Sequence, residues 1–355
     1  MKKATVVMLL ICALVGGFYA IRKVATQEDK TAASTKSSNK PFKSPEQMNG
    51  QNINVGFNVK GSLSVKEQCS FLRSELEKLK KENIKTEKIW LRLQGGSISQ
   101  KTYPSDWTDE AILPWAEIQR DFGCQYTFTI NFNDTPENQM EFYKRLRSKG
   151  ITFTFIELGN EQYLPKYALS KIDEFDEVTK RTSNMTAEKY ITMCNEYINT
   201  FKTAGLPFYV QFAPEKEEKT NAAAWNKAIA EGINNNKFSS KDIHGTIHLY
   251  ERDGEGSLNE KQINEIRSLV KCQMNMAVTE YGAVDKRDKL SSNELIAQEK
   301  SLTTRILRGL HNGDTLLNQV LYTDYDNDKA AVFHPYYHGI TPKGKAIFEL
   351  FKKYW

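Results

Sequence analysis

The sequence has few of the residues that usually bind metal ions and none of the common nucleotide-binding patterns. Its 355 residues include only five cysteines and five histidines. No C-x-x-C pair and no H-E-x-x-H motif occurs among them, so a zinc site is not indicated. The turn after the first expected strand, V-K-G-S-L-S at 59–64, is neither G-x-G-x-x-G nor a P-loop. We therefore expect neither a metal nor another cofactor.

Net charge is also absent from most of the chain. Residues 1–50 carry eight Lys or Arg and three Asp or Glu, which leaves 41 basic and 41 acidic residues for 51–355. The basic pI of about 8.7 therefore comes from the N-terminal segment. A neutral main part of the chain argues against nucleic acid as a partner and slightly favours an uncharged substrate.

Only the N-terminus contains a long apolar run. Two lysines precede the run at residues 4–21, whose length lies between that of a signal-peptide core and that of a membrane-spanning helix. Residues 1–25 are therefore expected to direct export, either as a cleaved signal peptide or as a retained membrane anchor. The protein would then be periplasmic, at the cell surface or extracellular. Residues 26–50 are polar and rich in Ser and Lys, which predicts a disordered linker.

Residues 51–355 alternate between short apolar runs and helical patterns. Eight such β/α units favour a closed (β/α)8 barrel of the TIM type over an open doubly wound sheet. We therefore expect one α/β domain, with a long insertion at 166–185 that could shape a binding cleft. The expected strands are residues 52–59, 88–93, 126–132, 151–158, 208–213, 243–250, 274–281 and 317–325.

Two glutamates stand at the ends of expected strands. Glu161 follows the fourth strand in G-N-E-Q-Y, and Glu280 ends the seventh in V-T-E-Y-G. Functional residues of such barrels project from the C-terminal ends of the strands, so both carboxylates should meet at one mouth. Two carboxyl groups can cleave a glycosidic bond, because one protonates the leaving oxygen and the other attacks the anomeric carbon or activates water. Each glutamate alone is more often a surface or ion-pair residue, and Glu157 is interpreted as paired inside the barrel or at its wall.

The order of these motifs resembles that of clan A glycoside hydrolases, retaining barrel enzymes with Asn-Glu on strand four and a second Glu on strand seven. The resemblance covers residues 52–355. G-N-E at 159–161 resembles their acid/base motif, particularly in heparanase-like and arabinofuranosidase/xylosidase-like branches, and V-T-E-Y-G at 278–282 is similar to their nucleophile motif. L-R-L-Q-G-G-S at 91–97 resembles the strand-two Arg motif, and H-L-Y at 248–250 matches the strand-six His-x-Tyr pattern.

The resemblance implies a retaining glycosidase with Glu161 as acid/base and Glu280 as nucleophile. It also implies that Asn160 binds a sugar hydroxyl. Tyr250 would donate a hydrogen bond to Glu280, and Arg92 would keep Glu280 ionised. Further candidate substrate-binding residues are His248, Asn131, Asn133, Trp107, Tyr163, Tyr281, Tyr322 and Tyr325.

Structural roles remain open for several of these candidates. His248 could be a core histidine, Asn131 could form a turn, and each aromatic ring could pack in the core. Residues 321–327 read L-Y-T-D-Y-D-N, without the Trp that many clan members carry at the end of strand eight, so the sugar stays open. The expected partner is an oligo- or polysaccharide, and no protein partner is indicated. The alternative function is a non-catalytic carbohydrate-binding barrel of the cell envelope.

Overall fold

The computed structural model describes a large part of the chain. The described residues are 52–59, 65–93, 95, 99–100, 103–164, 185–215, 221–251, 258–283, 291–318, 331–334 and 337–355. The expected signal or anchor segment, the linker, almost all of the insertion at 166–185, and Tyr322 and Tyr325 lie outside them. Within these residues, no helix combines the length and the apolar character needed to cross a membrane.

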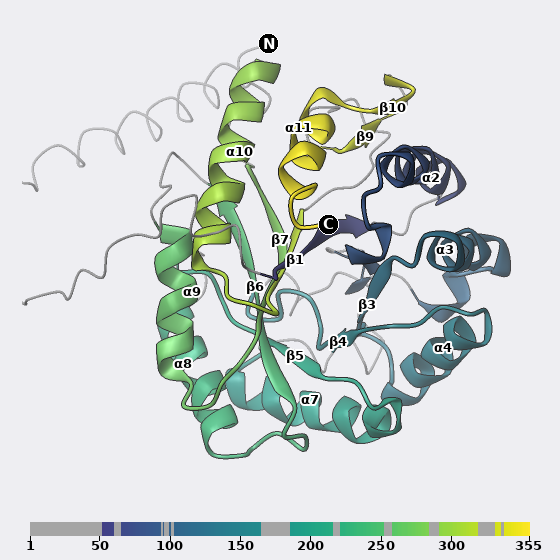
Figure 1. The fold of residues 1–355 in the computed structure, drawn as a ribbon. Helices are drawn as coiled ribbons and strands as arrows, with labels where there is room; N and C mark the ends of the chain where they lie inside the picture. The colour runs from purple at the N-terminus through teal and green to yellow at the C-terminus, as the bar shows by residue number, and fades with distance from the viewer. Residues whose placement is uncertain are drawn as a thin grey trace, which may run out of the picture. The chain divides into compact units, whose positions relative to one another are not determined.

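Eight parallel strands close into a barrel, in which each strand pairs with the next along the chain and the eighth pairs with the first (Figure 1). This arrangement confirms the expected (β/α)8 fold. The strands are β1 (Asn54–Val59), β2 (Ile89–Leu93), β3 (Gln125–Thr129), β4 (Phe155–Glu157), β5 (Phe208–Gln211), β6 (Ile243–Glu251), β7 (Met276–Ala283) and β8 (Thr315–Asn318).

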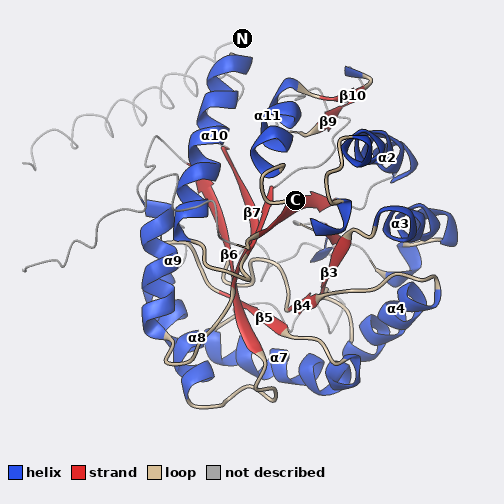
Figure 2. Cartoon of the chain, in the orientation of Figure 1, coloured by secondary structure: helices blue, strands red, loops and turns tan. Residues whose placement is uncertain are grey.

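Helices surround the barrel on its outer side (Figure 2). A short antiparallel pair, β9 (Phe333–His334) and β10 (Gly339–Ile340), precedes the last helix. The α-helices are α2 (Val65–Lys81), α3 (Asp109–Phe122), α4 (Pro136–Ser148), α7 (Ala187–Phe201), α8 (Ala222–Asn234), α9 (Leu258–Leu269), α10 (Ser292–Gly309) and α11 (Pro342–Phe351). The single-turn 3₁₀ helices are η3 (Thr86–Lys88), η5 (Pro104–Asp106) and η6 (Lys202–Ala204).

Local sequence explains where several helices begin. Thr135 and Thr341 each stand before a proline at the first helical position, and their hydroxyls accept hydrogen bonds from the backbone N–H groups of Asn138 and Gly344. A Thr-Pro pair favours a helix start, since the cap satisfies an otherwise unpaired donor and proline suits the first helical position. In α2, apolar residues recur at helical spacing, and Cys69, Leu72, Leu76 and Leu79 are buried.

The fourth strand is shorter than the sequence predicts. The prediction placed it at 151–158, whereas β4 begins only at Phe155. Gly150, with φ of 92°, ends the turn after α4, and the first contact with β3 comes when the N–H of Thr154 donates to the carbonyl of Tyr126 at 2.8 Å. Ile151 and Phe153 are buried and Thr152 between them is exposed, but these residues do not pair as a strand.

Alternation along the strands sends apolar side chains to the helices and polar ones to the barrel axis. In β1, the ring of Phe57 stacks on Phe348 of α11 with 5.1 Å between centroids. Its neighbour Asn58 instead accepts a hydrogen bond from Arg92 and donates one to the backbone carbonyl of Thr279, across the barrel interior. Inward polar positions near the C-terminal ends of the strands thus converge on one region.

Candidate active site

Arg92 stands at the centre of that region. It projects from β2, is fully buried, and donates through its three nitrogens to four carboxyl or amide side chains, one of which is Asn58. Its Nε donates to Oε2 of Glu157 at 2.5 Å, and its Nη1 donates to Oε1 of Glu280 at 2.5 Å. Its Nη2 donates to Oδ1 of Asn160 at 2.9 Å. One guanidinium therefore ties together the ends of β4 and β7, as its planar fork of donors allows.

Glu280 is held as a carboxylate. Besides Arg92, the hydroxyl of Tyr250 donates a hydrogen bond to its Oε2. Burial alone would raise the pKa of Glu280, but His248, Arg92 and Tyr250 outweigh it and lower the pKa to about 2. The expected contacts of Tyr250 and Arg92 with this carboxyl group are therefore both present, and the same burial raises the pKa of the Tyr250 hydroxyl well above its usual value.

Glu161 reaches the region through an unusual backbone turn. Gly159 and Glu161 both have positive φ, 83° and 50°, and the second is unfavourable for a residue with a Cβ. The amide of Gln211, at the end of β5, holds this turn, because its Oε1 accepts from the N–H of Gln162 at 2.9 Å and its Nε2 donates to the carbonyl of Gly159. Strained backbone that is held by its surroundings is typical of functional sites.

His248 lies between the two candidate catalytic glutamates. A register shift in the β6–β7 ladder after Ile247 pairs His248 with Glu280. Its Nδ1 is 3.1 Å from Oε1 of Glu161 and 3.9 Å from Oε2 of Glu280. Because both distances start from the same nitrogen, the two carboxylate oxygens cannot be farther apart than their sum. Residues 119 positions apart in the sequence therefore face one another at one mouth.

The charge of His248 follows from its neighbours. Burial alone would lower its pKa, but Glu280, Glu157 and Glu161 surround the ring and raise the pKa to about 9. Its Nε2 lies 3.1 Å from Oγ1 of Thr279 and 3.8 Å from Oε1 of Glu157. His248 thus belongs to a buried charged cluster, and both of its ring nitrogens face groups of the site. The members of this cluster are Arg92, Glu157, Glu161, His248 and Glu280.

Asn160 presents a donor without a partner among the described residues. The residue is fully buried, and its Oδ1 accepts from Arg92. Its Nδ2 has no hydrogen-bond partner in the part of the chain that the structure describes. Since a buried donor without a partner is costly, this amide is suited to a ligand hydroxyl.

Two polar residues of the cluster were not expected from the sequence. Asn58 contacts Arg92 at 3.2 Å, and Thr279 donates to Oε1 of Glu157 at 2.8 Å. Strand alternation predicts that both side chains point into the barrel, and this is the only sequence signal for them. Neither asparagine nor threonine is distinctive enough in a strand to indicate a site by itself. Glu157 itself is paired inside the barrel, as interpreted, although it ends β4 rather than lying in mid-strand.

Several candidate substrate-binding residues lie elsewhere. Oδ1 of Asn131 accepts from the backbone N–H of Asn133 at 2.8 Å, and Asn133 donates to the carbonyl of Gln100 at 2.7 Å, so both asparagines build a turn. Trp107 is buried with its ring 5.8 Å from that of Phe142 in α4, so it takes the core packing that the sequence left open beside a substrate contact.

Two tyrosines also have structural neighbours. Tyr281 is fully buried and accepts a hydrogen bond from Thr303 of α10 at 3.0 Å, because strand alternation turns it away from Glu280. Tyr281 thus takes the core packing that the sequence left open, and not a place at the mouth. Tyr163 packs edge-on against Trp225 of α8, 6.2 Å away.

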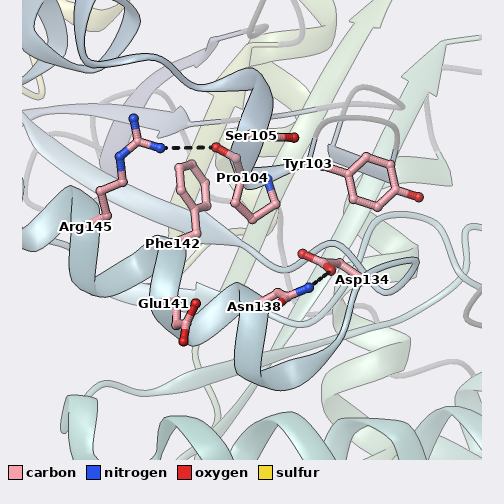
Figure 3. Close-up of a pocket in the computed structure, with 8 residues that line it drawn as sticks. All are labelled: Tyr103, Pro104, Ser105, Asp134, Asn138, Glu141, Phe142 and Arg145. Atoms are coloured by element: carbon pink, nitrogen blue, oxygen red, sulfur yellow. Dashed lines mark hydrogen bonds between the residues drawn. The ribbon is translucent and has the colours of Figure 1, made fainter.

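A separate pocket of about 420 Å³ lies between η5 and α4 (Figure 3). The carbonyl of Pro104 accepts a hydrogen bond from Arg145 at 3.3 Å across it. No member of the carboxylate cluster lines it. The lining residues are Tyr103, Pro104, Ser105, Asp134, Asn138, Glu141, Phe142 and Arg145.

A metal centre has no matching group of ligands in the described part of the chain. There, no three His, Cys, Asp or Glu side chains are grouped so that they could hold a metal ion. The carboxylates near the barrel axis are instead occupied by Arg92, Tyr250 and His248.

Comparison with known proteins identifies the fold. No family model matches the chain, and no curated protein matches its sequence. Solved structures do match, among them a GH5_18 protein from Streptomyces cattleya in complex with GlcNAc, with 9% identity and a TM-score of 0.57 over 86% of this chain and 80% of that one. The β-glycosidase BGL167 matches with 12% identity and a TM-score of 0.51, over 81% and 87%.

A third match extends this group. The family 51 α-L-arabinofuranosidase AbfB from Bifidobacterium longum has 12% identity and a TM-score of 0.50, over 76% of this chain and 63% of its own length. This chain thus spans less than two thirds of that enzyme. The structural neighbours are clan A glycoside hydrolases, and the chain shares their closed eight-stranded parallel barrel.

Proposed function

We propose that the protein is a retaining glycoside hydrolase that cleaves an O-glycosidic bond in an oligo- or polysaccharide. The observation that carries the proposal is the pair of glutamates on either side of Nδ1 of His248, of which only Glu280 is also held by Arg92 and Tyr250. Two carboxyl groups at one mouth with unequal surroundings can take unequal roles in acid and nucleophilic chemistry.

The spacing of the two groups supports retention of configuration. Retaining glycosidases separate their carboxyl groups by about 5 to 5.5 Å, and inverting ones by about 6.5 to 9.5 Å, because the latter must admit a water molecule. Oε1 of Glu161 and Oε2 of Glu280, which both face Nδ1 of His248, lie within the sum of 3.1 and 3.9 Å of each other. For this pair of oxygens, the upper limit includes the retaining range and only the lower end of the inverting range.

The proposed reaction has two displacements. Glu280 attacks the anomeric carbon and forms a glycosyl ester, while Glu161 gives its proton to the departing oxygen. Glu161 then takes a proton from water, which attacks the ester and releases the sugar with Glu280 restored. The unused Nδ2 of Asn160 would bind a sugar hydroxyl beside this centre.

The substrate class follows only broadly. The solved neighbours include a β-glycosidase and an α-L-arabinofuranosidase, which supports a carbohydrate substrate, β-linked or arabinofuranosyl. The intact set of Glu161, Glu280, Arg92 and Tyr250 supports hydrolysis over mere sugar binding. We also propose that the enzyme acts outside the cytoplasm, on the strength of the apolar run at 4–21.

Replacing the nucleophile tests this function. Glu280→Ala should abolish hydrolysis of aryl glycosides, because no group remains to attack the anomeric carbon. Added azide should restore part of the turnover and yield a glycosyl azide of inverted configuration, since a small anion fits the space of the lost side chain. Circular dichroism would check that the variant is folded. A folded Glu280→Ala variant that hydrolyses at the wild-type rate would refute the assignment.

A further inference from the structure

Glu157 is a buried carboxylate that the proposed reaction does not use. It ends β4 and has no exposed surface. Removing a carboxylate from water costs several kcal/mol unless charged and hydrogen-bonding partners compensate. Its oxygens are contacted from β2, β3, β6 and β7, half of the strands of the barrel.

Both oxygens of Glu157 have several partners. Oε2 accepts from Nε of Arg92 at 2.5 Å, and Oε1 lies 3.8 Å from Nε2 of His248. Burial alone would raise the pKa of Glu157, but Arg92 and His248 lower it below the usual value. Three hydroxyl groups also donate to this carboxylate, those of Thr279 at 2.8 Å and of Thr129 and Thr246 at 3.3 Å each.

The hydrogen bond between Glu157 and Nε of Arg92 fixes the direction of the other two guanidinium nitrogens. A guanidinium is planar and presents its donors in a rigid fork, so a hydrogen bond at Nε constrains both Nη atoms. Those atoms contact Glu280 and Asn160, the proposed nucleophile and the proposed sugar-binding amide. Glu157 therefore acts on the reacting groups through Arg92, from the buried side.

The charges of the cluster balance only with Glu157 included. Arg92 and protonated His248 supply two positive charges, and Glu280 supplies one negative charge. When Glu161 carries the proton that it donates, Glu157 is the second anion. Without it, a buried site would hold an excess positive charge, which favours loss of the proton from His248. The groups that face His248 are Glu157 and Glu161 from β4 and the turn after it, Glu280 from β7, and Thr279 beside its Nε2.

We propose that Glu157 is a positioning residue of the hydrolase: a buried counter-charge that orients Arg92 and keeps His248 protonated, without touching the sugar. This inference rests on the proposed function for its effect on turnover. The state of His248 is independent of turnover, so the two can be tested apart.

Glu157→Gln tests the counter-charge, because it removes the charge and keeps the size of the side chain. We expect His248, followed by nitrogen-15 NMR of labelled histidines and assigned with His248→Asn, to lose its proton at least one pH unit lower than in the wild type. We also expect kcat to fall about 100-fold with KM nearly unchanged, as a misplaced reacting group would give.

The matched control is Glu299→Gln. Glu299 is also buried and pairs with a buried Lys343 at 2.8 Å, but it lies in α10 outside the cluster. The Glu299→Gln variant should leave the titration of His248 and kcat unchanged. Glu157→Asp, which keeps the charge, should restore much of the His248 titration.

The outcomes separate the inference from the proposed function. A His248 titration in Glu157→Gln that equals the wild type overturns the counter-charge role, even if the protein hydrolyses glycosides. A lowered titration supports that role even if no glycoside is hydrolysed, in which case the proposed function fails alone. If Glu157→Gln does not fold, the wild type decides, because titration of His248 near the ordinary value of about 6.5 contradicts the inference and a value near 9 supports it.

Discussion

At the scale of single residues, Glu161 and Glu280 show how position gives one side-chain type two different surroundings. Glu280 is bound by Arg92 and Tyr250, which stabilise its charged form. Glu161 approaches from a turn with positive φ and contacts His248, without a hydrogen bond from either of those two residues among the described contacts. The surroundings, and not the residue type, therefore underlie the proposed roles of nucleophile and acid.

Truncation of the acid should depend on the leaving group. In Glu161→Ala, alkyl glycosides should lose about 1,000-fold in kcat/KM, because a poor leaving oxygen needs a proton as the bond breaks. Dinitrophenyl glycosides should lose far less in the first step, since their leaving group departs as a stable anion. The measurement is kcat/KM across aryl and alkyl glycosides of one sugar. Equal losses on both kinds of substrate would contradict the acid role.

At the scale of elements, the alternation of apolar runs and helical patterns was sufficient to predict the barrel. Each strand buried on both sides reads as an apolar run, and Thr-Pro pairs marked the starts of α4 and α11. The first residues of the predicted fourth strand were wrong, because buried Ile151 and Phe153 alternate with exposed Thr152 as in a strand. Periodicity does not show where pairing with the neighbouring strand begins.

The site was predictable where residues are both distinctive and at strand ends. Glu161, Glu280 and Arg92 meet these conditions, and the structure brings them together. Thr279 was missed because threonine is common in strands, and its contact with Glu157 depends on which face of β7 it occupies. The place of Trp107 stayed open, because an aromatic residue in a loop can reach the mouth or the wall, and only the packing on Phe142 decides.

The pairing of β1 with β2 depends on a small residue at Gly56. A Cβ at this position would lie 1.7 Å from the carbonyl oxygen of Trp90, a backbone atom of the neighbouring strand that cannot move alone. Gly56→Ala should therefore reduce the free energy of unfolding by about 3 kcal/mol or more, at the upper end for overpacking. Urea denaturation of the wild type and of Gly56→Ala measures this loss in free energy of unfolding.

Gly205→Ala is the control for this prediction. Gly205 has φ of 65° but nothing within 4 Å of an added Cβ, so only backbone strain opposes the change. Gly205→Ala should reduce the free energy of unfolding by about 1 to 2 kcal/mol. A loss at Gly56→Ala no greater than at Gly205→Ala would show that the strands separate without cost.

At the scale of the whole molecule, the charged cluster links β2, β4, β6 and β7 and should make stability depend on pH. The pKa of His248 is raised in the folded state to about 9, so its contribution is complete below its unfolded value of about 6.5 and is lost as pH rises through 9. The pKa of Glu280 is lowered to about 2, so its contribution is present above about 4.3 and is lost as pH falls through 2.

The contribution of this cluster should thus be greatest between about pH 4.3 and 6.5. Urea unfolding of the wild type and of His248→Asn between pH 5 and pH 10 checks the alkaline side. The difference between the two proteins in free energy of unfolding should shrink as pH rises through 9, by about 1.4 kcal/mol for each unit by which folding shifts the pKa. A difference that stays constant over this range would contradict a charged His248.

The most direct test of two carboxylates meeting at one sugar carbon is to trap the covalent intermediate. The fluorine of a 2-deoxy-2-fluoro glycoside slows both displacements. A good leaving group speeds only the formation of the ester, so the ester accumulates on the protein. After a panel of aryl glycosides has identified the sugar, digestion and mass spectrometry of the inactivated protein should place that sugar on Glu280. A label on another residue, or hydrolysis with inversion at the anomeric carbon, would contradict the account.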